Sequence, residues 1–143
     1  MPTLAAYDAM QRRGEQIGMP AVSRHKNQEV LQCGQQAVEL ARAAGVRVGF
    51  GTDLMGPLED EQLHGLRLQA EAAGIWAALA SATSVNAELI GRPDLGRVAE
   101  GCTADLLILN GNIGDDPSVL WSPGSQRTIV QHGQVITDST APL

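Results

Sequence analysis

The sequence predicts an α/β protein in which helices and short strands alternate first and strands alone follow. Two observations favour this class. Over the first 94 residues, long runs with apolar residues at helical spacing are separated by short β-like runs. Beyond that point the helical spacing stops, and short apolar runs bounded by turn residues indicate strands. We therefore expect two regions, one covering 1–94 and the other covering 95–143.

The first region opens with a very short apolar run at 2–4 that has the character of a strand end. A helical stretch over 7–17 follows and stops at a Gly-Met-Pro breaker. The next helix is expected over 23–44, because its apolar residues lie three and four apart and Gly45 suits the position after a helix end. Residues 46–50 are typical of a buried strand. We expect this strand to run parallel to the first one, with the long helix connecting them.

Two more helices complete the first region. One is expected over 59–73 and is broken by Gly74, and the other over 75–90. In the second region the apolar runs predict three strands, the last two of which form a hairpin around a His-Gly turn: 104–109, 127–132 and 134–137.

Composition and charge exclude two classes of partner. The net charge is −6, from 10 basic and 16 acidic residues, whereas binding to nucleic acid needs a dense stripe of Lys and Arg. No apolar run is long enough to span a bilayer, and the N-terminus lacks a charged and then apolar secretory pattern. We expect no nucleic-acid partner, no membrane partner and a cytoplasmic location.

One carboxylate, Asp53, directly follows the predicted strand in the stretch GVRVGFGTDLMG. Three interpretations are open. Thr52 and Asp53 can form an Asx-type turn that satisfies loop N–H groups before the next helix. The glycines at 49 and 51 partly match a dinucleotide-binding fingerprint, although its third small position holds Leu54. Alternatively, Asp53 is a metal ligand and proton acceptor, since catalytic residues of (β/α) barrels lie at the carboxyl ends of the strands.

Tyr7 follows the short first run by three residues. It is either a partly buried packing residue or a hydroxyl that donates to a substrate, and both follow from the same loop position. The three histidines, His25, His64 and His132, show neither i, i+4 nor His-x-His spacing. The chain alone is therefore not expected to supply a histidine-based metal site, and His64 is expected to be solvated or packed.

Four segments together resemble the C-terminal third of the amidohydrolase superfamily, whose members are metal-dependent hydrolases with a (β/α)8 TIM barrel and a small β-sandwich. The opening segment, PTLAAYD, resembles the branch that contains Xaa-Pro dipeptidases and imidazolonepropionase-like peptidases. The resemblance implies a partial TIM barrel, its last two βα units, over 1–94 and part of the β-sandwich over 95–143. The four segments are 45–53 (GVRVGFGTD), 80–91 (ASATSVNAELIG), 95–109 (LGRVAEGCTADLLIL) and 129–135 (IVQHGQV).

The resemblance also implies a role for Asp53. In the family the matching aspartate ligates a divalent metal, most often zinc as one or two ions, and shuttles a proton to the leaving amine. The implied reaction is cleavage of a C–N bond in a small amide or dipeptide, and the implied role of Tyr7 is binding of that substrate. The family's His-x-His pair, bridging lysine or acid and further histidines have no counterparts here. No metal is therefore expected in this chain alone.

Three functional hypotheses remain. The chain is part of a metal-dependent amidohydrolase whose other part supplies the missing ligands, or a catalytically inactive truncated α/β remnant, or a nucleotide-binding module. A part of a barrel leaves strand edges and apolar helix faces unpaired, so we also expect self-association through these edges.

Overall fold

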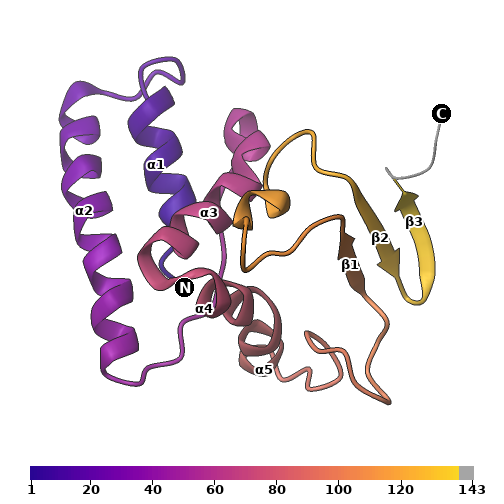
Figure 1. Cartoon of the computed structure of the whole chain (residues 1–143). Coiled ribbons are helices and arrows are strands. Elements are labelled where there is room, and N and C mark those ends of the chain that lie inside the picture. Colours follow the sequence, from indigo (N-terminus) through magenta and orange to yellow (C-terminus); the bar gives the residue numbers. More distant parts are fainter. Residues whose placement is uncertain (139–143) are drawn as a thin grey trace. The chain divides into compact units, whose positions relative to one another are not determined.

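The computed structural model describes residues 1–138 and consists of helices followed by a small antiparallel sheet (Figure 1). Its internal contacts divide the chain into two compact units, the first being Met1–Ala82 and the second beginning at Thr83. The expectation of a mixed α/β chain is confirmed.

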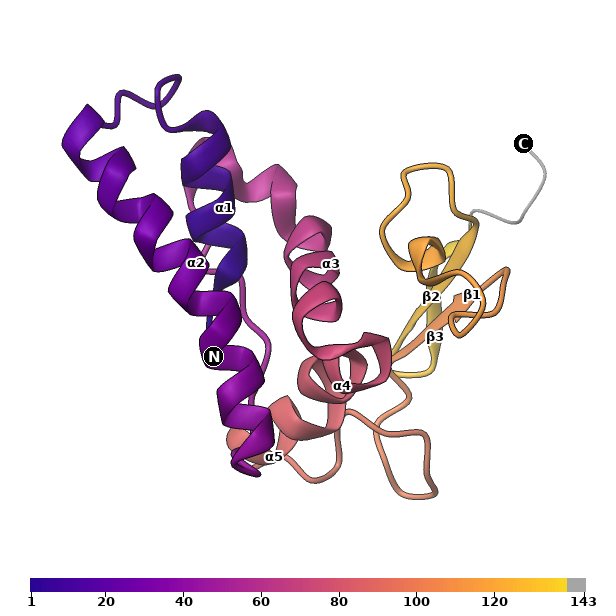
Figure 2. The same ribbon diagram turned by 60° about the vertical axis from the view of Figure 1, so that its left-hand side comes forward.

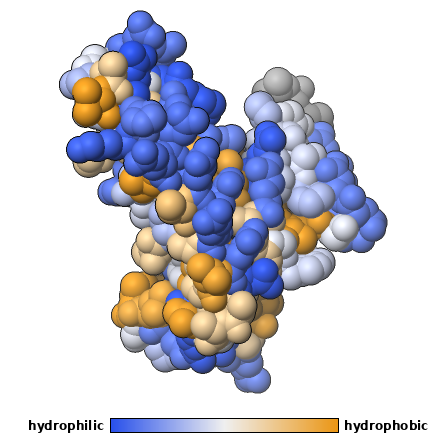
Figure 3. All heavy atoms as spheres, turned by 90° about the vertical axis from the view of Figure 1, so that its left-hand side faces the viewer, coloured by the Kyte–Doolittle hydropathy of each residue, from blue (hydrophilic) through white to orange (hydrophobic). Residues whose placement is uncertain are grey.

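The first unit is helical. Helices α1, α2 and α3 pack on one another, and Figures 1 and 2 both show α2 running alongside α1. On the face seen in Figure 3, hydrophilic side chains predominate in the upper part, and hydrophobic side chains gather in the lower part. The elements of this unit are α1 (Leu4–Arg13), α2 (Ala21–Ala43), the 3-10 turn η1 (Gly56–Glu61), α3 (Gln62–Ala73) and α4 (Ile75–Ala80).

Helix α2 ends as the sequence predicts. Gly45 has a φ of 71°, its N–H donates to the Arg42 carbonyl at 3.0 Å, and the N–H of Val46 donates to the Ala41 carbonyl at 2.8 Å. This pair of bonds is the Schellman arrangement, which satisfies the last carbonyls of a helix. The start differs slightly, since α2 begins at Ala21 behind Pro20 rather than at Ser23.

Two clusters of buried side chains hold the first unit together, and α1 contributes to both. One contains Leu4, Val38, Leu68 and Ala73, and the other contains Ala5, Ala9, Leu54 and Leu58. Small side chains let the helices approach closely. A Cβ added at Gly34 of α2 would lie 2.9 Å from Cδ2 of Leu4, and Ala9 is completely buried. The alanine-rich face of α1 is therefore the centre of this unit.

The prediction of two parallel strands in the first region is wrong. Leu4 already begins α1, and residues 46–50 belong to neither helix nor strand. A strand requires a neighbouring strand to exchange ladder hydrogen bonds with. The three strands of the described residues all follow residue 105 and pair with one another. Near Phe50, the backbone N–H instead donates to the Ser81 carbonyl at 3.3 Å.

The helix expected over 75–90 forms with an interruption. It consists of α4, a π-helical turn over Ser81–Val85 and α5 (Asn86–Leu89), and it ends at Gly91 with a φ of 70°. A π-turn inserts one extra residue into a helix and locally changes which side chains share a face.

The second unit contains the expected strands, β1 (Leu106–Leu109), β2 (Arg127–Gln131) and β3 (Gln134–Asp138). They form an antiparallel sheet in the order β1-β2-β3, with Leu107 opposite Ile129. His132 and Gly133 both have positive φ, 49° and 78°, as a two-residue hairpin turn of type I′ requires. Among residues 1–138 no helix combines the length and the apolar character needed to cross a membrane.

Candidate functional site

Asp53 occupies a loop that is anchored on both sides. Its own side chain is exposed, and its φ of 53° lies in the left-handed region, which Asp adopts more readily than most residues with a side chain. On one side, the Thr52 hydroxyl donates to Oε1 of Gln62 at 2.6 Å. On the other side, Leu54 is only 8% exposed and belongs to the cluster with Ala5. The loop therefore presents Asp53 outward between two fixed neighbours.

Gly65 of α3 makes this arrangement possible. A Cβ at this position would lie 2.7 Å from Cβ of Ala5 and 3.1 Å from Cγ2 of Thr52. Real Cβ atoms do not approach other atoms as closely as the first of these distances, so a larger residue would push α3 away from α1 or from the loop. The absence of a side chain at Gly65 lets helix α3, helix α1 and the Asp53 loop meet.

Charged side chains join α1 to η1 and α3 next to this loop. Nε of Arg12 donates to Oδ2 of Asp8 at 2.7 Å, and the two terminal nitrogens of Arg12 donate to the two carboxylate oxygens of Glu61. Nε2 of His64 lies 2.8 Å from the same Asp8 oxygen. The sequence alone does not predict this network. Asp8 and Arg12 do lie four apart on a predicted helix, but their partners are about fifty residues away and depend on tertiary packing.

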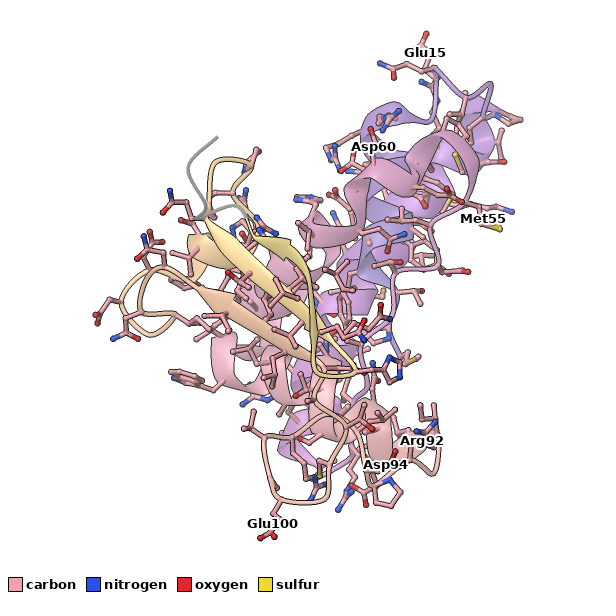
Figure 4. All side chains as sticks on the ribbon, turned by 90° about the vertical axis from the view of Figure 1, so that its right-hand side faces the viewer. Glu15, Met55, Asp60, Arg92, Asp94 and Glu100 are labelled. Carbon is pink, nitrogen blue, oxygen red and sulfur yellow. The ribbon has the colours of Figure 1, made fainter. Side chains whose placement is uncertain are left out.

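Arg13 adds a second connection between α1 and η1. Its guanidinium donates to Oδ1 of Asp60 and to the carbonyl of Pro57, both at 2.7 Å. Asp60 is labelled in Figure 4, where it lies on the η1 segment. The hydrogen bonds from Arg12 hold the pKa of the Glu61 carboxyl below its ordinary value, although its partial burial opposes this shift. Glu61 is therefore an anion at neutral pH, as a bidentate pair with arginine requires.

Tyr7 lies on α1 and is partly buried, which agrees with the packing interpretation of the sequence. Its carbonyl accepts a hydrogen bond from Nδ2 of Asn27 at 2.8 Å, and Asn27 is only 5% exposed. Within residues 1–138 the structure makes no hydrogen bond between Tyr7 and Asp53. The two candidate residues thus stand on separate elements of the same unit, α1 and the loop before η1.

The described part of the chain does not gather three or more His, Cys, Asp or Glu residues into a group that could hold a metal ion. His64 is engaged with Asp8, and Nε2 of His25 lies 3.6 Å from a Glu29 oxygen on the exposed side of α2. Asp53 offers one carboxylate, a suitable ligand type for a divalent metal, while protein metal sites take three or more ligands. Residues 1–138 therefore do not form a site of three or more ligands by themselves.

Comparison with known proteins identifies the fold family. The profile of the amidohydrolase family matches residues 2–136. The chain is similar to a crystallised prolidase in complex with N-methylphosphonate-L-proline, with 37% identity and a TM-score of 0.86 over 95% of this chain and 34% of that one. It is similar to an amidohydrolase with 34% identity and a TM-score of 0.85 over 95% of this chain and 33% of that one.

A third similar structure is a Xaa-Pro dipeptidase with methionine bound in its active site. Here the identity is 25% and the TM-score 0.77, over 94% of this chain and 33% of that one. No match was found among curated proteins. The chain spans about a third of the length of these solved relatives. Its match to the family profile covers nearly the whole sequence, and the chain belongs to the amidohydrolase family.

Proposed function

We propose that this chain is part of a metal-dependent amidohydrolase that cleaves C–N bonds in small amides or dipeptides. One observation carries the proposal. A member of the amidohydrolase family presents one exposed carboxylate, Asp53, in the left-handed region of a loop that is fixed on both sides. Backbone conformations of this kind are concentrated at functional sites, because the surrounding structure must hold them.

The proposal includes the architecture. Residues 1–94 would supply the last two βα units of a TIM barrel, and residues 95–143 part of a β-sandwich. The similarity to solved relatives of about three times this length supports it. In a complete barrel, the segment 46–50 would gain a strand on each side, and its backbone would then be paired along its whole length.

Asp53 has two tasks in this proposal. Amidohydrolases generally use divalent metals, and a bound metal supplies Lewis-acid polarisation of the scissile carbonyl together with a lowered pKa of water. Asp53 is one carboxylate ligand of that metal, with the other ligands coming from outside this chain. As a base, Asp53 accepts a proton from the attacking water, and as an acid it returns this proton to the departing nitrogen. Zinc is the metal we propose.

The substrate we propose is a dipeptide of the Xaa-Pro type. The support comes from two similar structures, one of a prolidase complexed with N-methylphosphonate-L-proline and one of a Xaa-Pro dipeptidase with bound methionine. We further propose a cytoplasmic location and self-association through unpaired edges. Exposed apolar side chains support the latter, since Leu40 on α2 and Val46 in the loop behind it are 70% and 58% exposed.

Tyr7 is proposed as a contact to this substrate. Replacing Tyr7 with phenylalanine in an active parent protein is expected to raise KM about fivefold or more through loss of one hydrogen bond, and to leave the fold intact. Steady-state kinetics with a Xaa-Pro dipeptide measures this effect. Unchanged kinetics would assign Tyr7 to packing on α1 alone.

Zinc content provides a separate prediction for the chain as it stands. We expect the purified 143-residue protein to hold far less than one zinc ion per chain and to hydrolyse no amide, because Asp53 alone cannot form a site of three or four ligands. Metal analysis after dialysis measures the content. One tightly bound zinc ion per chain would contradict this prediction, because the 143-residue chain would then supply all the ligands itself.

The reading frame upstream of Met1 tests the proposal most directly. An in-frame His-x-His segment followed by a further lysine or histidine set would supply the missing ligands, and the longer product should then hydrolyse Xaa-Pro dipeptides. A frame that lacks these residues would favour an inactive α/β remnant. Tight binding of an adenine nucleotide by the 143-residue chain would favour the nucleotide-binding alternative.

A further inference from the structure

The geometry around the Asp53 loop points to a positioning device that begins on α1. We propose that Arg12 and Glu61 fix the place of Asp53 through Gln62 and Thr52. The inference rests on the proposed function, because it concerns the residue that we place in the reaction. It assigns roles to four residues that the sequence analysis did not include among the site residues.

The need for such a device follows from the loop itself. Residues 51–55 belong to no helix or strand, so regular backbone hydrogen bonding does not fix them. Asp53 nevertheless keeps a left-handed conformation at a φ of 53°, which costs a non-glycine residue about 1 kcal/mol or more and persists only where neighbouring contacts impose it. The contacts on either side of Asp53 must therefore hold it in place.

The device can be followed residue by residue. Arg12 holds the carboxylate of Glu61 with both terminal nitrogens, and Asp8 holds Arg12 through its Nε. Gln62 is the next residue in the chain after Glu61 and starts α3. Its side-chain carbonyl accepts the 2.6 Å hydrogen bond from the Thr52 hydroxyl, and Thr52 directly precedes Asp53. One fork of hydrogen bonds, one single hydrogen bond and two peptide bonds thus connect helix α1 to Asp53.

Burial sets this network apart from ordinary surface ion pairs. The carboxylates of Glu61 and Asp8 are 14% and 17% exposed and Arg12 is 44% exposed, whereas the Arg67–Glu71 pair on α3 is 51% and 50% exposed. Exposed pairs hold their side chains weakly, while bidentate pairs are stronger and fix an orientation. The Arg67–Glu71 pair is joined by a single 2.8 Å hydrogen bond from Nε and has no link to Thr52, so it serves as the control for an ordinary surface ion pair.

The test measures the amplitude of fast backbone motion in the 143-residue protein by NMR relaxation, read at residues 52–56 and separately at α2. Thr52→Val keeps the shape of the side chain and removes its hydroxyl, and it is expected to increase the motion at 52–56, so that order parameters fall from about 0.85 to below about 0.6, without changing α2. Thr52→Ser retains the hydroxyl and should keep the low amplitude of the unchanged protein. Glu61→Gln and Arg12→Lys should act like Thr52→Val, since a lysine cannot reproduce the bidentate fork. Arg67→Ala should leave the motion at 52–56 unchanged.

Three results would overturn the proposal: no change at 52–56 in Thr52→Val, an equal increase in Thr52→Ser, or the same increase in α2, which would indicate general destabilisation. In an active parent protein, Glu61→Gln should lower kcat about tenfold with KM unchanged, because the acid is misplaced while the substrate site remains. The two proposals fail separately. A fully active Asp53→Asn variant would overturn the proposed function and leave the result on loop motion standing. An inactive Asp53→Asn variant together with unchanged loop motion in Thr52→Val would overturn the positioning device and leave the proposed function standing.

Discussion

Replacing Asp53 with asparagine in an active parent protein is expected to lower kcat about a hundredfold or more, which is the scale of general acid–base catalysis. Asparagine has nearly the same shape and also tolerates the left-handed conformation that Asp53 adopts at a φ of 53°. It cannot accept a proton and carries no negative charge for a metal. The loss of kcat should therefore come from the missing proton acceptor and the missing charge at the metal. The free energy of unfolding should change by no more than a few tenths of a kcal/mol.

Glu59→Gln is the matched control for this variant. Glu59 is an exposed carboxylate on η1, six positions after Asp53, and its substitution removes one negative charge from the same part of the surface. We expect its kcat and KM to equal those of the unchanged protein. Steady-state kinetics of both variants, together with metal analysis, separates loss of proton transfer from loss of metal. Full activity of the Asp53→Asn variant would show that Asp53 has only a structural role in an Asx-type turn.

Replacing Gly96 with alanine is expected to destabilise the second unit by about 3 kcal/mol. The φ of Gly96 is 72°, where a side chain costs about 1–2 kcal/mol. The added Cβ would also lie 2.5 Å from the carbonyl carbon and oxygen of Thr83 and 2.9 Å from the nitrogen of Ser84. These are backbone atoms and cannot turn away as a side chain can, so overpacking adds about 1–3 kcal/mol.

Gly101→Ala separates the two contributions. Gly101 has a similar φ of 80°, but an added Cβ would meet nothing within 4 Å, so only the conformational cost of about 1 kcal/mol should remain. The chain has two tryptophans, Trp76 in the first unit and Trp121 in the second. Urea unfolding followed by Trp121 fluorescence in a Trp76→Phe background therefore reports on the second unit. Equal losses for the two variants would contradict the close approach to Thr83.

Local signals in the sequence predicted most of the secondary structure. Gly45 and Gly91 mark helix ends because a positive φ there allows the last carbonyls to be satisfied, and the structure places both at such ends. The His132-Gly133 turn and the apolar runs around it predicted the hairpin for the same local reason. Figure 4 shows another local feature, the pair of Arg92 and Asp94 joined by hydrogen bonds of 2.8 and 2.6 Å. These bonds lower the pKa of Asp94 to about 2.

Features that depend on distant partners were not predicted. The segment 46–50 has the composition of a buried strand. Composition indicates a preference for pairing in a sheet, but it does not show whether a neighbouring strand is present. His64 was expected to be solvated or packed, and it pairs with Asp8, fifty-six residues earlier in the chain. The sequence shows that Asp53 follows a β-like run, whereas its contacts through Gln62 and Leu54 depend on the packing of α3 and α1.

The position of α1 in both buried clusters has a consequence for how the first unit unfolds. Leu4 belongs to one cluster, and Ala5 and Ala9 belong to the other, although all three lie within two turns of one helix. Neither cluster can open without exposing part of the helix that completes its neighbour, so the two should behave as a single foldon. Native-state hydrogen exchange would then give similar opening free energies for α2 around Val38, which belongs to the first cluster, and for η1 at Leu58, which belongs to the second.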